Sequence, residues 1–102
     1  MTVKELAEHL NSNKEIQLLD VRETYEWDIC HIKGAINIPM GMIDDAMDKI
    51  CKDKKTVVMC HHGMRSMNTI QYLKTKGFNK LINLDGGIHA WAVEIDSEME
   101  TY

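Results

Sequence analysis

The chain has 102 residues, of which 44% are hydrophobic and 27% charged, and its net charge is −4. These values fit one domain over residues 1–102 with a modest core, and an acidic chain without a basic stripe is not expected to bind nucleic acid. No apolar run approaches the ~20 residues that span a bilayer, and the amino terminus lacks the pattern of a signal peptide. Because three cysteines in no disulfide-like spacing are typical of a reducing compartment, we expect a cytoplasmic protein without a membrane partner.

The chain begins with a predicted helix and a predicted central strand. A capping box at Thr2–Glu5 predicts a short helix that runs to about Leu10. Residues 11–13 then indicate a break in regular structure. Residues 16–21 are largely apolar, which is typical of a strand buried on both faces.

The following segments alternate between the same two patterns. Residues 23–29 predict a short helix with Tyr25 or Trp27 against the core, whereas Glu23 and Glu26 are expected at the surface. Further strands are predicted at 35–38, 56–59 and 80–84, helices at 43–51 and 66–76, and a turn leading into a helix at 86–91. This alternation predicts an α/β fold with a central, mostly parallel sheet of about four or five strands and helices on both faces.

Residues 60–66, Cys-His-His-Gly-Met-Arg-Ser, join a predicted strand to a predicted helix that has apolar residues at Met67, Ile70 and Leu73. Backbone N–H groups at such a junction have no intrahelical partners, so they favour an anion and lower a thiol pKa from about 8.5 toward about 3.5–7.5. Gly63 permits a tight turn there, and Arg65 adds a positive charge. We therefore expect a nucleophilic cysteine at Cys60, although a lone cysteine is more often a buried structural residue.

Three separated motifs, in order, resemble the rhodanese domain family. They are residues 18–23 with 26–27 and 31–39, then residues 60–66, and finally residues 77–78 with 84–91. The resemblance implies a rhodanese-like three-layer fold and a sulfurtransferase of the thiosulfate sulfurtransferase type. In such an enzyme Cys60 takes a sulfane sulfur, becomes a persulfide and passes the sulfur to a thiol, cyanide or protein acceptor.

The chemistry of the loop agrees with this interpretation. A Cys60 thiolate that attacks the outer sulfur of a donor releases an anion, whose charge needs nearby hydrogen-bond donors. Two covalent steps predict ping-pong kinetics, and neither a metal nor another cofactor is required. The expected site consists of the catalytic Cys60 and the substrate-binding residues His61, His62, Gly63, Met64, Arg65 and Ser66, in which Arg65 holds an anionic donor through two hydrogen bonds.

The alternatives differ in what the loop would do. Four residues separate Cys60 from Arg65, whereas related phosphatases have five, so phosphate chemistry is disfavoured. Structural zinc is also disfavoured, because adjacent side chains point in different directions and no C-x2-C or H-x3-H pair is present. The remaining alternative is a carrier or non-catalytic rhodanese module that presents sulfur to a partner protein or regulates it.

Several positions depart from the family pattern or lie beside it. His61 stands where the family often has arginine, so a persulfide is expected to be a better donor than the dianion thiosulfate. Cys30 and Cys51 are interpreted as packed small residues rather than resolving thiols. Asp20 and Arg22 are expected to orient the chain through hydrogen bonds.

Overall fold

The computed structural model describes residues 1–12 and 15–102, so Asn13 of the predicted break lies outside the described residues. The helices are α1 (Val3–Asn11), α2 (Thr24–Ile29), α3 (Ile43–Ala46), α4 (Met64–Thr75) and α5 (Gly87–Glu94), with short 3-10 turns η1 (Met40–Met42) and η2 (Met47–Lys49). The strands are β1 (Gln17–Asp20), β2 (Ile36–Asn37), β3 (Thr56–Met59) and β4 (Leu81–Asn83). The predicted order of helices and strands is confirmed, and the capping box of Thr2 and Glu5 begins α1.

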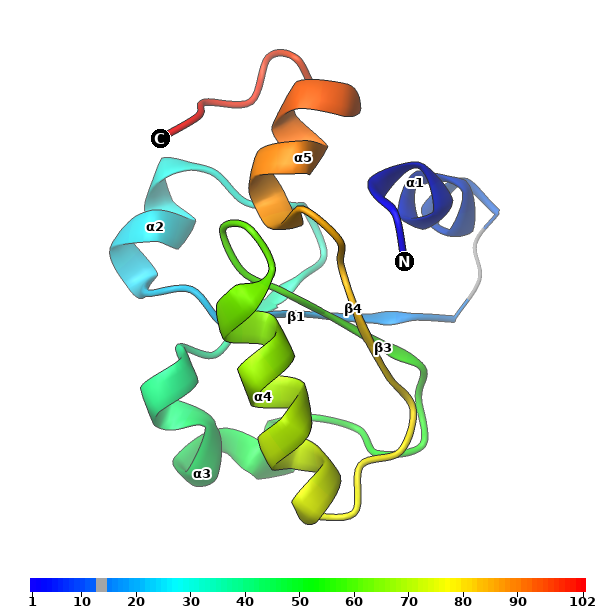
Figure 1. The fold of residues 1–102 in the computed structure, drawn as a ribbon, viewed down its shortest axis with the longest axis vertical. Helices are drawn as coiled ribbons and strands as arrows, with labels where there is room; N and C mark the ends of the chain where they lie inside the picture. The colour runs from blue at the N-terminus through cyan, green and yellow to red at the C-terminus, as the bar shows by residue number, and fades with distance from the viewer. Residues whose placement is uncertain (13–14) are drawn as a thin grey trace.

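The four described strands form one parallel sheet in the order β2-β1-β3-β4. Helices α1 and α5 lie on one face of this sheet and α3 and α4 on the other (Figure 1). The expected α/β fold with helices on both faces is therefore confirmed, with four strands. Within the described residues, no helix is long and apolar enough to cross a membrane.

Alternate side chains of the central strands enter two separate cores. Val58 belongs to the core under α3 and α4, whereas Val57 and Met59 belong to the core under α1 and α5. Cys60, the residue after β3, continues this alternation and lies in the same core cluster as Val58. Its side chain is thus directed by the strand that precedes it.

The order of the strands reverses beside β1, because β2 pairs with one edge of β1 and β3 with the other. Asp20 of β1 lies opposite Met59 of β3, so the carboxyl ends of these strands are neighbours. In open parallel sheets, ligands bind where the strand order reverses. The loop after Met59 and helix α2 both leave the sheet at this edge (Figure 1).

The prediction for α2 is wrong in which side chain faces inward. Tyr25 is 67% exposed, and Trp27 is partly exposed and stacks on His31 with the ring centroids 3.9 Å apart. Glu26, expected at the surface, is 3% exposed. The reason is that the inward side of α2 faces Arg65 of α4 rather than an apolar core, so its inner position holds a carboxylate.

Smaller differences have local causes. Helix α4 begins at Met64, two residues before the prediction, and Met67 is exposed while Thr69 is buried. The predicted helix at 43–51 is split into α3 and the turn η2. Cys51, interpreted as a packed residue, is exposed because it follows η2 in a surface turn.

Candidate active site

Cys60 is 1% exposed, yet its sulfur is directed at hydrogen-bond donors. The N–H of Gly63 donates to Sγ at 3.0 Å, and the Ser66 hydroxyl lies 3.3 Å from Sγ. Burial alone raises the pKa of the Cys60 thiol, but hydrogen bonds from the Ser66 hydroxyl and from the N–H groups of Ser66, Gly63 and His62 lower it on balance. The surroundings therefore favour a thiolate despite low exposure.

The turn that brings these donors to the sulfur depends on Gly63. This residue has φ +122°, a conformation that side chains with a Cβ rarely adopt, and it caps the start of α4. Its carbonyl accepts a hydrogen bond from the Asn83 amide at 3.3 Å and lies 3.1 Å from the Ser66 hydroxyl oxygen. Ser66 also contacts the Asn83 side chain, so the end of β4 supports the loop.

Helix α5 supports the other side of the loop. The N–H of Ile88 donates to the Cys60 carbonyl at 2.9 Å, and the N–H of His89 donates to the His61 carbonyl at 3.1 Å. These two bonds use donors of the first turn of α5, which has no intrahelical partners for them. The backbone of the loop is thus held while the N–H groups of His62, Gly63 and Ser66 act on the sulfur.

The guanidinium of Arg65 is paired with an acidic side chain. Its two terminal nitrogens donate to the Glu26 carboxylate at 2.7 and 2.8 Å, in a bidentate ion pair. The Glu26 side chain is 4% exposed and that of Arg65 37%. The Arg65 hydrogen bonds lower the pKa of Glu26 against burial, to about 2, so both groups are charged at neutral pH.

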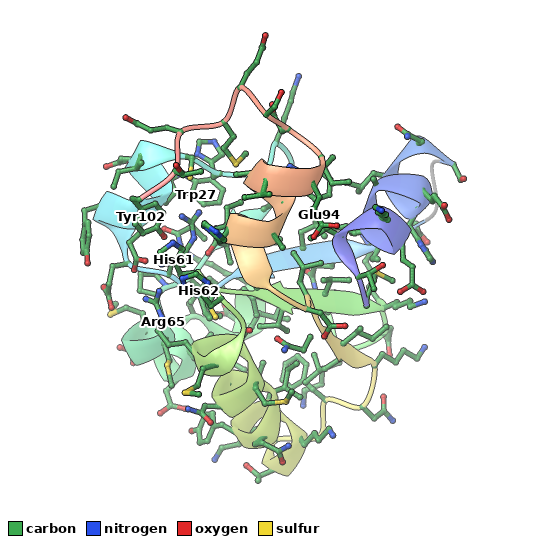
Figure 2. The ribbon with its side chains drawn as sticks, turned by 45° about the horizontal axis from the view of Figure 1, so that its top comes forward. Trp27, His61, His62, Arg65, Glu94 and Tyr102 are labelled. Carbon is green, nitrogen blue, oxygen red and sulfur yellow. The ribbon has the colours of Figure 1, made fainter. Side chains whose placement is uncertain are left out.

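Tyr102, the last residue of the sequence, adds a hydrogen bond to the Arg65–Glu26 pair and extends it into a network. Its hydroxyl donates to Glu26 at 2.7 Å and accepts from Arg22 at 2.9 Å. Its ring stacks on His61, with centroids 4.0 Å apart and planes 6° from parallel. Figure 2 shows Tyr102, His61, His62 and Arg65 gathered on one side of the molecule. Burial and the neighbouring His62 lower the pKa of His61.

Asp20 and Arg22, expected to orient the chain through hydrogen bonds, lie beside these residues and are bound to each other. The Arg22 guanidinium, wholly buried, donates to both Asp20 oxygens, with the shortest distance 2.6 Å. It also donates to the backbone carbonyls of Glu26 and Cys30. Burial raises the pKa of the Cys30 thiol, which is free, like that of Cys60.

An open cleft of about 650 Å³ lies beside the loop. Its lining includes His62, Gly63, Met64, Met67, Asn83 and Asp85. Met64, one of the predicted site residues, is 78% exposed. In the described part of the chain, no three histidine, cysteine or acidic side chains are arranged to hold a metal ion.

Sequence comparison identifies a family model and relatives that cover most of the chain. The family model of the rhodanese-like domain matches residues 2–94. The "Putative sulfurtransferase YtwF" of Bacillus subtilis is 40% identical, with 92% of this chain and 95% of that protein covered. The "Thiosulfate sulfurtransferase GlpE" of Shewanella oneidensis is 33% identical, with 89% of each covered.

A second group of relatives is larger, and solved structures share the fold. The "Probable adenylyltransferase/sulfurtransferase MoeZ" of Mycobacterium tuberculosis is 38% identical over the whole chain, which spans only 26% of that protein. A solved rhodanese-like domain protein from Staphylococcus aureus superposes with a TM-score of 0.86 at 32% identity, covering 100% of this chain and 96% of that one. From its sequence and its fold, the chain is a member of the rhodanese-like domain family, whose relatives here are named sulfurtransferases.

Proposed function

We propose that the protein transfers sulfane sulfur through a persulfide on Cys60. The observation that carries this proposal is the sulfur of Cys60 receiving the Gly63 N–H at 3.0 Å, in a loop whose amides and Ser66 hydroxyl lower the thiol pKa. A thiolate is the nucleophile that sulfur transfer requires. The names of the relatives YtwF and GlpE support the same reaction class.

The reaction has two balanced steps. The Cys60 thiolate attacks the outer sulfur of a donor, such as thiosulfate or a persulfide; the donor's sulfur–sulfur bond breaks, and sulfite or a thiolate leaves with the bonding pair. A thiol, cyanide or protein acceptor then attacks the outer sulfur of the persulfide and regenerates the thiolate. No external oxidant or reductant enters either step.

The remaining loop residues have supporting roles in this proposal. The amides of residues 61–66 stabilise the persulfide anion, and His62, Gly63 and Met64 border the cleft through which donor and acceptor approach. Arg65 adds a positive charge at the rim that Glu26 balances. The three free cysteines suit a reducing compartment such as the cytoplasm.

A carrier role is the second candidate. One relative, 29% identical, bears the name "Putative sulfur carrier protein YrkF". The exposed methionines Met64 and Met67 at the edge of the cleft would suit an apolar, adaptable contact with a protein acceptor. In that role the first transfer step is the same, and the two candidates differ in how fast small acceptors discharge the persulfide.

Intact mass after incubation with a sulfur donor tests the proposal. A gain of one sulfur, about 32 Da, that cyanide or dithiothreitol reverses is the expected result. Peptide mapping should place the sulfur on Cys60. A chain that gains no mass from any donor would contradict both the enzyme and the carrier interpretation.

A further inference from the structure

The charged side chains beside the Cys60 loop cancel one another. Loop residues 60–66 contain one arginine, Arg65, and both of its terminal nitrogens are bound to Glu26 at 2.7 and 2.8 Å. Behind this pair, Arg22 donates to both Asp20 oxygens through Nε and one terminal nitrogen. Tyr102 bridges the two pairs as an uncharged hydroxyl, because burial raises its pKa to about 12.

Two arginines therefore face two carboxylates, and the network has no net charge. His61 does not supply the missing positive charge at neutral pH, because burial lowers its pKa and its ring is covered by Tyr102. When Cys60 is ionised, the thiolate adds one negative charge that the network does not offset. At the sulfur itself, the hydrogen-bond donors are the uncharged Gly63 N–H and Ser66 hydroxyl.

A donor with two negative charges meets net repulsion at such a site. Uncompensated charge near a reacting group changes association rates by about 10- to 1,000-fold, and the effect is weakened by salt. A donor with one negative charge is repelled less and still gains the hydrogen bonds of the loop amides. The Glu26 carboxylate is what removes the attraction that Arg65 would otherwise exert.

We infer that Glu26 makes the site selective for sulfane-sulfur donors with a single negative charge, such as organic persulfides and thiosulfonates, over the dianion thiosulfate. The inference rests on the proposed sulfur transfer through Cys60. Glu26 acts through Arg65 and does not touch the sulfur, so it is a positioning residue that sets donor specificity.

The reaction keeps the same balance for each donor. The Cys60 thiolate takes the outer sulfur, the donor's sulfur–sulfur bond breaks, and the leaving group carries away the bonding pair. Thiosulfate releases sulfite with two negative charges, an alkyl thiosulfonate releases a sulfinate with one, and an ionised persulfide releases a thiolate with one. Total charge is conserved in every case, so the donors differ only in the charge brought to the site.

Thiosulfate and methanethiosulfonate make a matched pair for the test, because a methyl group in the second replaces one anionic oxygen of the first. The second-order rate constant for adding sulfur to Cys60 is measured for each by intact mass, with the full chain. We expect Glu26→Gln to shift the ratio of the two constants toward thiosulfate by about tenfold. Using the ratio removes the intrinsic difference in reactivity between the donors.

Two control variants separate charge from structure. Asp28→Asn removes an exposed carboxylate from the same helix, and Tyr102→Phe removes the hydrogen bond to Glu26 but keeps both charges. Neither should shift the ratio by more than about twofold. A shift in the Tyr102→Phe protein equal to that of Glu26→Gln would overturn the inference, since the effect would then follow from geometry.

The unsubstituted protein supplies a test that does not depend on folding of a variant. Added potassium chloride should accelerate transfer from thiosulfate more than transfer from methanethiosulfonate, because salt screens the larger repulsion. Equal salt dependence for the two donors, or an unshifted ratio in Glu26→Gln, would overturn the inference while leaving sulfur transfer intact. If neither donor adds sulfur to Cys60, the proposed function and the inference fail together.

Discussion

Gly87, the first residue of α5, lies against the backbone of Cys60. A Cβ at Gly87 would lie 2.4 Å from the Cys60 carbonyl oxygen and 2.6 Å from that of His61. Because both neighbours are backbone atoms, they cannot rotate away as a flexible side chain would. The close approach allows the next two residues of α5 to donate their N–H groups to the same carbonyls.

Replacing Gly87 with alanine should therefore destabilise the protein and displace the loop. The φ of +60° already disfavours a side chain, and the overlap adds to that cost. We expect a loss of about 2–4 kcal/mol in the free energy of unfolding, measured by urea denaturation. Gly41→Ala is the control, since a Cβ there meets nothing within 4 Å; equal stability losses in the two variants would refute the close-packing argument.

Cys60→Ser should abolish cyanide-dependent formation of thiocyanate, because a hydroxyl cannot carry sulfane sulfur as a persulfide does. Cys30→Ser and Cys51→Ser are matched controls that remove the other two thiols, and they should keep most of the activity. The assay is thiocyanate release over time with thiosulfate or a thiosulfonate as the donor. Substantial activity in Cys60→Ser would mean that another residue carries the sulfur.

The loop around Cys60 is predictable from sequence because its parts are consecutive. The strand pattern before it, Gly63 within it and the helix pattern after it together indicate where the amides lie. The degree of exposure of the thiol is less accessible from sequence, because Cys60 is 1% exposed although it is expected to be a nucleophile. The alternation of β3 gives the direction of the side chain, but its near-complete burial depends on packing with the residues of the core cluster under α3 and α4.

The partners of Arg65 could not be found in the same way. Glu26 is 39 residues from Arg65, and Tyr102 is 76 residues from Glu26. A charged residue in a short helix is normally assigned to the surface, because ionised side chains are rarely buried unless paired. The pairing of Glu26 depends on tertiary structure, so its burial becomes visible only when α2 and the loop are placed together.

Ser66→Ala should raise the pKa of Cys60. The Ser66 hydroxyl, 3.3 Å from Sγ, lowers this pKa. Without it, fewer hydrogen bonds counteract burial, which raises the pKa. The pKa is measured from the ultraviolet absorbance of the thiolate as a function of pH, and persulfide formation at neutral pH should slow by about tenfold. Ser97→Ala replaces an exposed serine as the control. An unchanged thiolate titration in Ser66→Ala would show that this hydroxyl does not lower the pKa of Cys60.

Arg65→Ala should weaken the folded state in a way that depends on pH. The variant leaves the buried carboxylate of Glu26 without its bidentate partner, and we expect a loss of about 1–3 kcal/mol at neutral pH, since Arg65 is partly exposed. The folded-state pKa of Glu26 is lowered to about 2 from the ordinary 4.5. A lowered pKa means that the ion pair stabilises the fold fully above about 4.5 and that this stabilisation is lost as the pH falls toward about 2.

The difference in unfolding free energy between the unsubstituted protein and Arg65→Ala should thus be largest at neutral pH and shrink below about pH 4.5. Urea denaturation at several pH values measures it, with Lys33→Ala as a control that removes an exposed cation. A difference of the same size at pH 7 and near pH 3 would mean that Arg65 stabilises the fold by packing its side chain. A difference that shrinks with falling pH would show that Arg65 acts through its charge, the property on which the inferred role of Glu26 depends.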